Sequence, residues 1–234
     1  MDVLYILGKG SPFNNEELKY SLRSLERFGS NIGRLIIVGE KPSFLNYDKV
    51  VHLPFNESGV KEYRIASKIL HACTTVTVTG DFLFCNDDFF FMKPFDCDAF
   101  PFYKYGNLYN GTSASAYADH LKLTQQYLQS KGKSSFHFDV HCPIIYNAKK
   151  FMYLNDSWLH SRETIGMVVK STYCNMHDIE GVTYKDIKLK QLISTEEFES
   201  IKLNECFSIY DQAWKKGVEG YLMQTFQQKS QWEI

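Results

Sequence analysis

The sequence predicts an α/β domain whose central sheet is mixed but mostly parallel and is flanked by helices. Short apolar runs alternate with amphipathic helical patterns, an arrangement typical of parallel strands joined by helices. The 234 residues, 44% hydrophobic and 23% charged, are enough to bury a full core. No repeat, low-complexity tract or linker divides the chain. We therefore expect a single domain over residues 1–234.

The first strand and the first helix have clear signals. An apolar run at residues 3–7 predicts a strand, and the Gly- and Pro-containing residues 8–12 predict the loop that ends it. Asn14 is the expected N-cap of the next helix, with Glu17 three residues later and Gly29 as its stop. We expect this helix to pack an apolar face on the sheet.

Four more strands and a second helix are expected before residue 90. Apolar runs predict strands at residues 35–39, 50–53, 75–79 and 82–85. Ser58 is the expected cap of the helix that lies between the second and third of these runs. Because that helix joins two strands, its apolar face should cover the sheet.

Beyond residue 100 the pattern is looser. We expect a Gly- and Tyr-rich loop at 103–111, a helix at 112–130 and an irregular polar segment at 136–146. Shorter helices are expected near residues 149–158, 164–175, 195–202 and 217–227.

The net charge and the spacing of the cysteines bear on the class of protein and on its cellular compartment. A formal net charge of −1 excludes a nonspecific nucleic-acid coat, because it provides no overall attraction to polyanions. The six cysteines form no CxxC pair, which favours free thiols in a reducing cytoplasm. The apolar start is too short for a signal peptide, and no run approaches the roughly 20 residues of a membrane helix. We expect a cytoplasmic protein without a membrane span.

Adjacent carboxylates follow a buried strand at Asn86, Asp87 and Asp88. Placing two acids beside so many apolar residues is costly unless something compensates their charge. At the carboxyl end of a strand, a Mn²⁺ or Mg²⁺ ion bound by these carboxylates could also bind a nucleotide diphosphate. The alternative is structural: the acids cap a turn or pair with Lys93.

Two other clusters carry candidate chemistry. Helical spacing places Lys61, Arg64 and Lys68 on one stripe, suited to phosphate or sugar-acid oxygens unless it is simply a solvated face. Alternation along an extended segment would place Asp139 and His141 on one face, where either could take a proton from an acceptor hydroxyl. The alternatives are structural histidines or a zinc site that uses the residues His137, His141 and Cys142.

Several segments in the first 95 residues resemble the Stealth-type sugar-phosphate transferases. They are NEELKYSLRSLER at 15–27, LIIV at 35–38, PSFLN at 42–46 and FCNDDFF at 84–90. That family includes capsular polysaccharide phosphotransferases and the enzyme that tags lysosomal glycans, and its fold is related to the GT-A glycosyltransferases. His141 with Pro143 is similar to the family's later histidine block.

The resemblance implies roles for particular residues. Asp87 and Asp88 would serve metal and donor binding, and Arg23 would contact a nucleotide or phosphate. Where the family reads V-D-G-S-D after the first strand, this chain has LGKGS at residues 7–11, with Lys9 replacing the first acid and no acid after Ser11. This difference favours glycosyl transfer over phosphotransfer, with the loop approaching the donor's phosphates.

We therefore expect one GT-A-like domain that transfers a glycosyl group from a nucleotide sugar to an acceptor hydroxyl, assisted by a divalent cation. Residues 1–95 would form the nucleotide-sugar half and 96–234 the acceptor half. The metal ligands would be Asp87 and Asp88, and the catalytic residues Asp139 and His141. The expected donor-binding residues are Lys9, Gly10, Arg23, Lys61, Arg64, Lys68 and Asn86.

Three alternatives stay open at this point. The first is Stealth-type sugar-phosphate transfer from the same kind of donor. The second is a viral enzyme that glycosylates hydroxymethylated bases in DNA, with Tyr103, Tyr105 and Tyr109 stacking a flipped base. The third is a sugar-binding module without catalysis, which would have little use for the paired carboxylates. The acceptor is accordingly a glycan or modified DNA.

Overall fold

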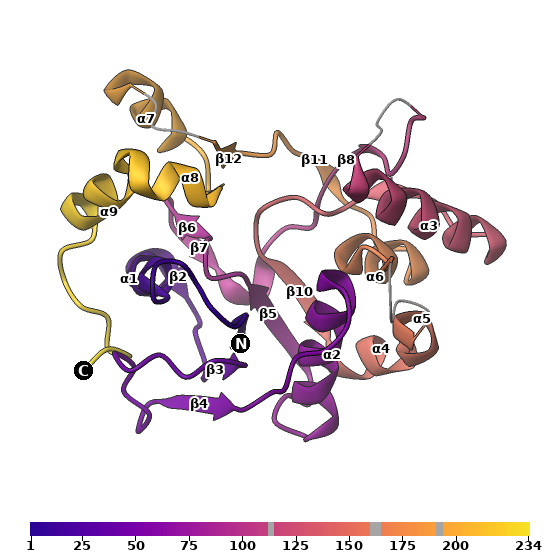
Figure 1. The fold of residues 1–234 in the computed structure, drawn as a ribbon, viewed down its shortest axis with the longest axis horizontal. Coiled ribbons are helices and arrows are strands. Elements are labelled where there is room, and N and C mark those ends of the chain that lie inside the picture. Colours follow the sequence, from indigo (N-terminus) through magenta and orange to yellow (C-terminus); the bar gives the residue numbers. More distant parts are fainter. Residues whose placement is uncertain (112–114, 160–164, 191–193) are drawn as a thin grey trace.

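The computed structural model describes residues 1–111, 115–159, 165–190 and 194–234, and it has the expected α/β architecture (Figure 1). A five-stranded sheet with the order β10-β5-β1-β3-β4 forms its centre. All its neighbouring pairs are parallel except the pair of β10 with β5. The strands are β1 (Asp2–Ile6), β3 (Leu35–Val38), β4 (Val50–Leu53), β5 (Asp81–Cys85) and β10 (Ile144–Asn147).

Strand β1 is the point at which the order of the sheet reverses. Tyr5 is in register with Ile37 of β3 on one side and with Cys85 of β5 on the other. From β1 the chain builds outward through β3 and β4, then returns to place β5 on the opposite side. Ligands in open α/β sheets bind beyond the carboxyl ends of the strands at such a reversal.

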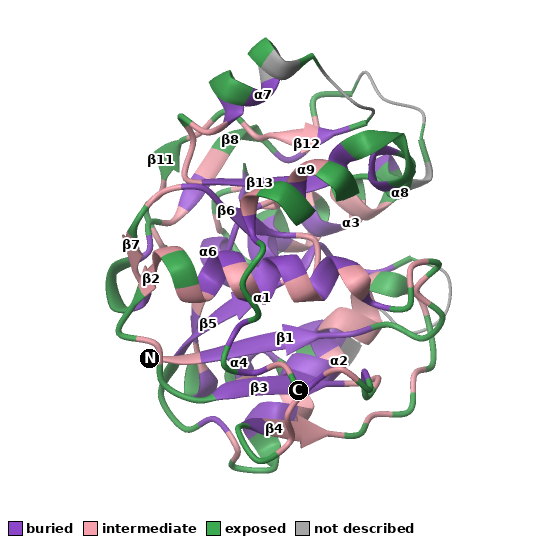
Figure 2. Ribbon diagram, turned by 90° about the vertical axis from the view of Figure 1, so that its left-hand side faces the viewer, coloured by how far each residue is buried: buried purple, intermediate pink, exposed green. Residues whose placement is uncertain are grey.

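Helices α1 (Glu16–Phe28) and α2 (Lys61–Thr74) cover opposite faces of the sheet. Val3 and Tyr5 of β1 share one apolar cluster with α1, whereas Leu4 and Ile6 share another with α2. This is the alternation expected of a strand buried on both faces. Figure 2 shows the resulting buried layer through β1, β3 and β5.

Both expected helix caps are wrong in detail. Helix α1 begins after Asn15, whose side chain makes no capping hydrogen bond, and Asn14 and Asn15 both have left-handed backbones. The Glu17 carboxylate instead accepts a hydrogen bond from Ser11 Oγ, 2.9 Å away. Helix α2 begins after Val60, again without a side-chain cap, rather than at Ser58.

The strand expected at residues 75–79 is also wrong, because these residues form a turn and a bend followed by irregular backbone. The Thr75 hydroxyl donates to the His71 carbonyl, 2.7 Å away, and so satisfies the end of α2. Val76 has a φ of 58° and is exposed. Threonines favour strands on average, but here their hydroxyls bond locally and terminate a helix.

The second half contains more strand than expected. The presumed loop at 103–111 includes β8 (Tyr103–Asn107), which pairs with β9 (Phe136–His137) and β11 (Val182–Thr183). The presumed irregular segment at 136–146 supplies β9 and most of β10. Small sheets are also formed by β2 (Gly29–Ser30) with β7 (Phe95–Asp96), and by β6 (Phe90–Phe91), β12 (Lys188–Leu189) and β13 (Cys206–Ile209).

Helices were predicted better than strands in this half. The helix expected at 149–158 is divided into two helices. In the helix expected at 164–175, residues 165–168 are not helical and the observed helix begins at Val169. The expected starts at 112 and 164 lie outside the described residues. A short helix, Cys97–Ala99, follows β7, and a π-helical turn, Trp214–Val218, joins the last two helices. The helices are α3 (Ala116–Ser130), α4 (Ala148–Tyr153), α5 (Asn155–Leu159), α6 (Val169–Met176), α7 (Thr195–Ile201), α8 (Asp211–Ala213) and α9 (Glu219–Thr225).

The structure also bears on the expected free thiols and on the expected absence of a membrane span. All six cysteines are buried and free. Within the described ranges, no helix combines the length and apolar character needed to cross a membrane.

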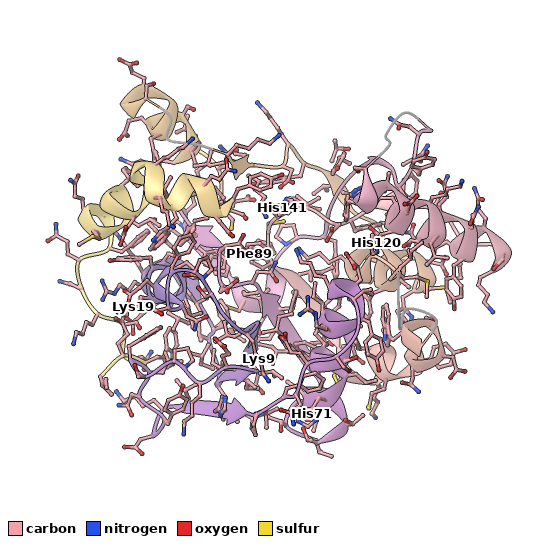
Figure 3. All side chains as sticks on the ribbon, in the orientation of Figure 1. Lys9, Lys19, His71, Phe89, His120 and His141 are labelled. Carbon is pink, nitrogen blue, oxygen red and sulfur yellow. The ribbon has the colours of Figure 1, made fainter. Side chains whose placement is uncertain are left out.

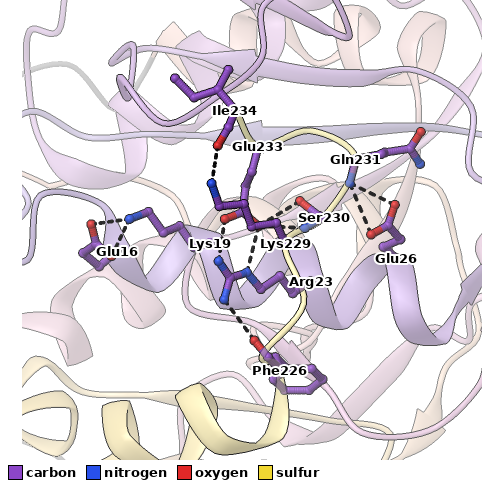
Figure 4. A network of polar contacts seen from close by, with 10 residues as sticks. All are labelled: Glu16, Lys19, Arg23, Glu26, Phe226, Lys229, Ser230, Gln231, Glu233 and Ile234. Carbon is purple, nitrogen blue, oxygen red and sulfur yellow. Dashed lines mark hydrogen bonds and ion pairs between the residues drawn. The ribbon is translucent and has the colours of Figure 1, made fainter.

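The last residues, 229–234, fold back onto α1, and we call them the C-terminal clasp (Figure 4). The Arg23 guanidinium donates to both oxygens of Glu233, with Nε to Oε1 at 2.8 Å and Nη2 to Oε2 at 2.7 Å. Glu26 accepts a hydrogen bond from the backbone N–H of Gln231, and Trp232 is buried. The clasp therefore fastens the end of the chain to its first helix.

Candidate active site

The largest of three neighbouring cavities lies where the carboxyl ends of β1 and β5 meet. This first cavity has a volume of about 870 Å³. One wall carries Lys9 from the loop after β1 and the α2 stripe, and Asn86, Asp87 and Asp88 follow β5. Its lining contains these residues that the sequence predicted for donor or metal binding: Lys9, Lys61, Arg64, Lys68, Asn86, Asp87 and Asp88.

Another part of the lining comes from the C-terminal half and was missed by sequence reasoning. It includes Lys188, Lys190, Tyr210 and Asp211. Lys188 Nζ lies 3.6 Å from Asp88 Oδ2 and 4.7 Å from the centre of the Tyr210 ring. No local motif marks these residues, because pairing of β12 with β13 brings them together.

Three acidic residues, Glu17, Asp87 and Asp88, line one cavity near the end of β5. Burial raises the pKa of Asp87 to about 8, with further contributions from the charges of Asp88 and Glu17. Burial also raises the pKa of Glu17, although the hydrogen bond from Ser11 opposes this. Asp88 accepts a hydrogen bond from Ser208 Oγ, 2.7 Å away. The negative charge at this point is only partly compensated by the protein itself.

Glu17 was not among the predicted site residues. Its Oε2 atom and the Oδ1 atom of Asn15 are buried and, in the described chain, have no hydrogen-bond partner. Both residues line a third cavity of about 230 Å³, together with Asp87 and Asp88. The sequence did contain a signal for Glu17. Glu17, Ser21 and Ser24 form a polar stripe at helical spacing on the buried face of α1.

These acids have the chemistry of ligands for a hard cation. Across the described residues, no three His, Cys, Asp or Glu side chains lie close enough together to form a metal site. Mg²⁺ commonly binds through one or two carboxylates and completes its shell with water and substrate phosphates. Asp87 and Asp88 are the two carboxylates that could serve in this way, and the unpartnered oxygen of Glu17 lines the same cavity.

The basic stripe divides into two kinds of residue. Lys68 is 3% exposed, and its ammonium donates to the Leu7 carbonyl at the end of β1 and to the Glu57 carboxylate. Burial alone would raise the pKa of Glu57, but the hydrogen bond and charge of Lys68, and then the charge of Arg64, lower it. Arg64 Nη1 lies 3.1 Å from Glu57 Oε2, but its side chain is 40% exposed. Lys68 therefore holds the strand end in place, whereas Arg64 is accessible to a ligand.

The remaining donor-binding candidates lie in different places. Lys9 lines the first and third cavities, and Gly10 lines the third, where its N–H donates to Glu40 Oε1 at 2.9 Å. Arg23 lies apart from the three cavities, because it is paired with Glu233 in the C-terminal clasp. The structure thus brings the loop after β1 to the site and places Arg23 in the framework.

A second cavity, of about 480 Å³, adjoins the first. The two cavities share lining residues, among them Asn86 and Lys188. Both predicted catalytic residues, Asp139 and His141, line the second cavity. Figure 3 shows His141, Phe89 and Lys9 in the middle of the molecule, with Lys19 and His71 toward its edges. Apolar lining is supplied by Ile65, Phe84, Phe89, Val140, Val168 and Val169.

Asp139 and His141 have different partners. Tyr117 donates its hydroxyl hydrogen to Asp139 Oδ2 at 2.5 Å. Burial opposes ionisation of Asp139, but the charge of Lys170 and the Tyr117 hydrogen bond outweigh it and lower the Asp139 pKa. His141 Nδ1 lies 2.5 Å from Asp186 Oδ2. Asp139 is therefore an ionised hydrogen-bond acceptor, while His141 has a carboxylate behind its ring.

The residues of the zinc alternative are not brought together as a site in the described structure. His137 stacks on Tyr105 with ring centres 4.3 Å apart, and burial lowers the pKa of His137. The other tyrosines proposed to stack a base are also outside the three cavities. Tyr103, for example, stacks on Tyr184 with ring centres 4.2 Å apart.

No protein-family model matches this chain, and no curated protein matches it either. The roles of the residues around the two larger cavities therefore rest on their positions and chemistry. The Stealth-type resemblance stays a prediction from sequence.

Proposed function

We propose that the protein is a GT-A-like glycosyltransferase that moves a glycosyl group from a nucleotide sugar to an acceptor hydroxyl. The observation that supports this most strongly is the pair of adjoining cavities. The first combines adjacent carboxylates with several cations, and the second contains Asp139 and His141. A donor in the first cavity and an acceptor in the second would meet at the shared wall near Asn86.

The donor binds with its diphosphate in the first cavity. Lys9, Arg64, Lys188 and Lys190 provide positive charge around it, and phosphate oxygens are favourable partners for such groups. Asp87 and Asp88 would hold Mn²⁺ or Mg²⁺, and the ion would supply charge stabilisation for the departing diphosphate. Reversal of the strand order at β1 supports this placement, because it opens a ligand crevice between the ends of β1 and β5.

The acceptor binds in the second cavity with its reactive hydroxyl toward His141. The acceptor oxygen forms a bond to the anomeric carbon of the sugar as the bond from that carbon to the phosphate oxygen breaks. The hydroxyl proton passes to His141 Nε2, and the bonding electrons leave with the nucleoside diphosphate. Asp139, with its lowered pKa, accepts a hydrogen bond that orients the acceptor.

Two measurements test this function. A thermal-shift panel of nucleotides and nucleotide sugars, with and without Mn²⁺ or Mg²⁺, should identify a donor, because a ligand bound only to the folded protein raises its stability. With an acceptor present, we expect release of nucleoside diphosphate, and His141→Ala should slow that release far more than it weakens donor binding. A panel without any nucleotide-dependent shift would favour a non-catalytic sugar-binding module.

The leaving nucleotide separates glycosyl transfer from sugar-phosphate transfer. Breaking the anomeric bond releases a nucleoside diphosphate, whereas breaking the diphosphate releases a nucleoside monophosphate. Chromatography of the spent donor and phosphorus NMR of the acceptor product distinguish them. Monophosphate in solution with phosphorus on the acceptor would replace our proposal with Stealth-type sugar-phosphate transfer. A product on hydroxymethylated DNA alone would identify the nucleic-acid-modifying alternative.

A further inference from the structure

Four hydrogen bonds hold the ring of His141 and the backbone around it. Its backbone N–H donates to Asp186 Oδ1 at 2.9 Å, and its ring Nδ1 lies 2.5 Å from Asp186 Oδ2. Lys170 is buried, and its ammonium donates to the carbonyls of Val140 and Cys142, each 2.6 Å away. Lys170 therefore holds the carbonyls of the two residues that flank His141, independently of the His141 ring.

Asp186 lies behind this ring, in the segment between β11 and β12, and is absent from the described lining of the three cavities. Burial opposes the ionisation of Asp186, yet the hydrogen bond and charge of His141 lower the Asp186 pKa. An ionised carboxylate only accepts hydrogen bonds, so the ring must place a proton on Nδ1. The other nitrogen, Nε2, then has a free lone pair.

We propose that Asp186 is a positioning residue that fixes His141 in the tautomer with its proton on Nδ1, so that Nε2 is the base that faces the second cavity. The use of that base in glycosyl transfer rests on the function proposed above. The tautomer itself does not, because it follows from the two contacts between Asp186 and His141.

The substitution Asp186→Asn tests this assignment with almost no change of shape. An asparagine side chain has a single acceptor oxygen. The backbone N–H of His141 points at this side chain and needs an acceptor, so it takes the asparagine oxygen. The asparagine NH₂ group then faces Nδ1 and donates to it. The ring proton must move to Nε2, so the variant keeps the backbone contact but loses the lone pair that would accept the proton.

The first readout is the tautomer, measured without any substrate. Long-range proton–nitrogen NMR of the ¹⁵N-histidine-labelled full chain should show a neutral His141 ring protonated on Nδ1 at pH 8, and on Nε2 in Asp186→Asn. Assignment by comparison with His141→Gln identifies the signals. A wild-type ring protonated on Nε2, or on both nitrogens at this pH, would overturn the inference. So would a variant with an unchanged tautomer.

The second readout is turnover with the donor and acceptor found in the nucleotide panel. We expect Asp186→Asn to lower kcat by about a hundredfold, as loss of a general base does, while donor affinity in calorimetric titration stays within twofold. A matched control is Asp2→Asn, because Asp2 also accepts from a backbone N–H and a side chain, those of Arg34, at the start of β1. The control should keep full kcat.

The two proposals fail in different ways. If no nucleotide sugar is turned over but the tautomer changes as expected, Asp186 positions His141 and the glycosyltransferase proposal is wrong. If turnover occurs and Asp186→Asn leaves kcat unchanged, glycosyl transfer stands and the inference about Asp186 is wrong. A variant that unfolds is recognised by its thermal transition, and the wild-type NMR measurement then decides the matter alone.

Discussion

The carboxylates of Glu233 and Asp87 belong to partly buried residues, but their surroundings are opposite. Glu233 receives both donors of the Arg23 fork and two from Ser230, and these contacts outweigh burial and lower the Glu233 pKa. Burial, with the neighbouring acids Asp88 and Glu17, raises the pKa of Asp87. A charge that the protein compensates serves the fold, and one that it leaves uncompensated is available to a ligand.

Helix α1 shows the same contrast within one element. Glu17, in its first turn, has an unpartnered oxygen at the third cavity. Arg23, less than two turns further along, is fully engaged by the C-terminal clasp. The contrast predicts that substitutions near the cavities change binding and turnover, whereas substitutions in the clasp change the free energy of unfolding.

The largest effect should follow loss of charge beside the cavities. We expect Asp87→Asn and Asp88→Asn each to lower turnover by at least about a hundredfold, because stabilisation of the developing charge in the transition state is lost. Steady-state kinetics with increasing Mn²⁺ or Mg²⁺ measures the effect. A chelator should reproduce it in the wild type. Normal turnover in both variants, or indifference to the chelator, contradicts the metal assignment.

The ligand-free protein should respond in the opposite direction. The pKa of Asp87 is raised from 3.8 to about 8, so ionising Asp87 in the folded state costs stability as the pH rises through this window. Asp87→Asn avoids that cost. Its thermal transition, measured without metal, should therefore lie above that of the wild type at pH 8, and the difference should shrink toward pH 4. A lower transition at pH 8 would show that Asp87 is needed by the fold.

In the clasp, the expected change is in stability. Glu233→Gln should lower the free energy of unfolding by about 1.5–3 kcal/mol at pH 7, measured by urea denaturation, because a buried charged hydrogen-bond partner is lost. The Glu233 pKa is lowered from 4.5, so this contribution is present above pH 4.5 and disappears as the pH falls through the folded-state value. The gap between variant and wild type should close accordingly.

The matched control for the clasp is Glu199→Gln. Glu199 also pairs with a cation, Lys202, but on an exposed helix surface. Exposed pairs contribute little, so this variant should differ from the wild type by less than about 0.5 kcal/mol. Equal losses in Glu199→Gln and Glu233→Gln would remove the distinction between compensated buried charge and ordinary surface charge.

The smallest effect concerns Arg64. Its guanidinium is shared with Glu57 and is 40% exposed, so Arg64→Ala should weaken donor binding by only about fivefold, or roughly 1 kcal/mol. Arg27→Ala is the comparison, because Arg27 donates to the Thr225 carbonyl and lies over the Phe28 ring, away from the three cavities. Equal affinities in calorimetry would assign Arg64 to the solvated surface.

The parallel part of the sheet was predictable because its strands are continuous apolar runs, such as residues 35–38, that only burial on both faces explains. Strand β10 was missed because its neighbourhood reads as polar and irregular, and its pairing with β5 is decided by contacts far apart in sequence. Residues 75–79 have strand-forming side chains, yet in the described part of the chain they pair with no strand.

In the candidate site, the residues that belong to local sequence motifs were predictable. Asn86, Asp87 and Asp88 follow a strand directly, so their place at the sheet edge could be inferred from order alone. Lys188, Tyr210 and Asp186 could not be found this way, because each reaches its position through pairing between distant segments. Arg23 was predicted to bind the donor but does not line the cavities, because it pairs with Glu233, which is distant in sequence. The local motif around Arg23 does not reveal this partner.

The antiparallel pairing of β10 with β5 has a consequence for synthesis of the chain. Strand β5 is complete at Cys85, but the partner for its outer edge begins only at Ile144. During the interval, an apolar strand with unpaired backbone groups is exposed on the growing chain, and such edges recruit other chains. A nascent polypeptide paused between these residues should be the form most dependent on chaperones.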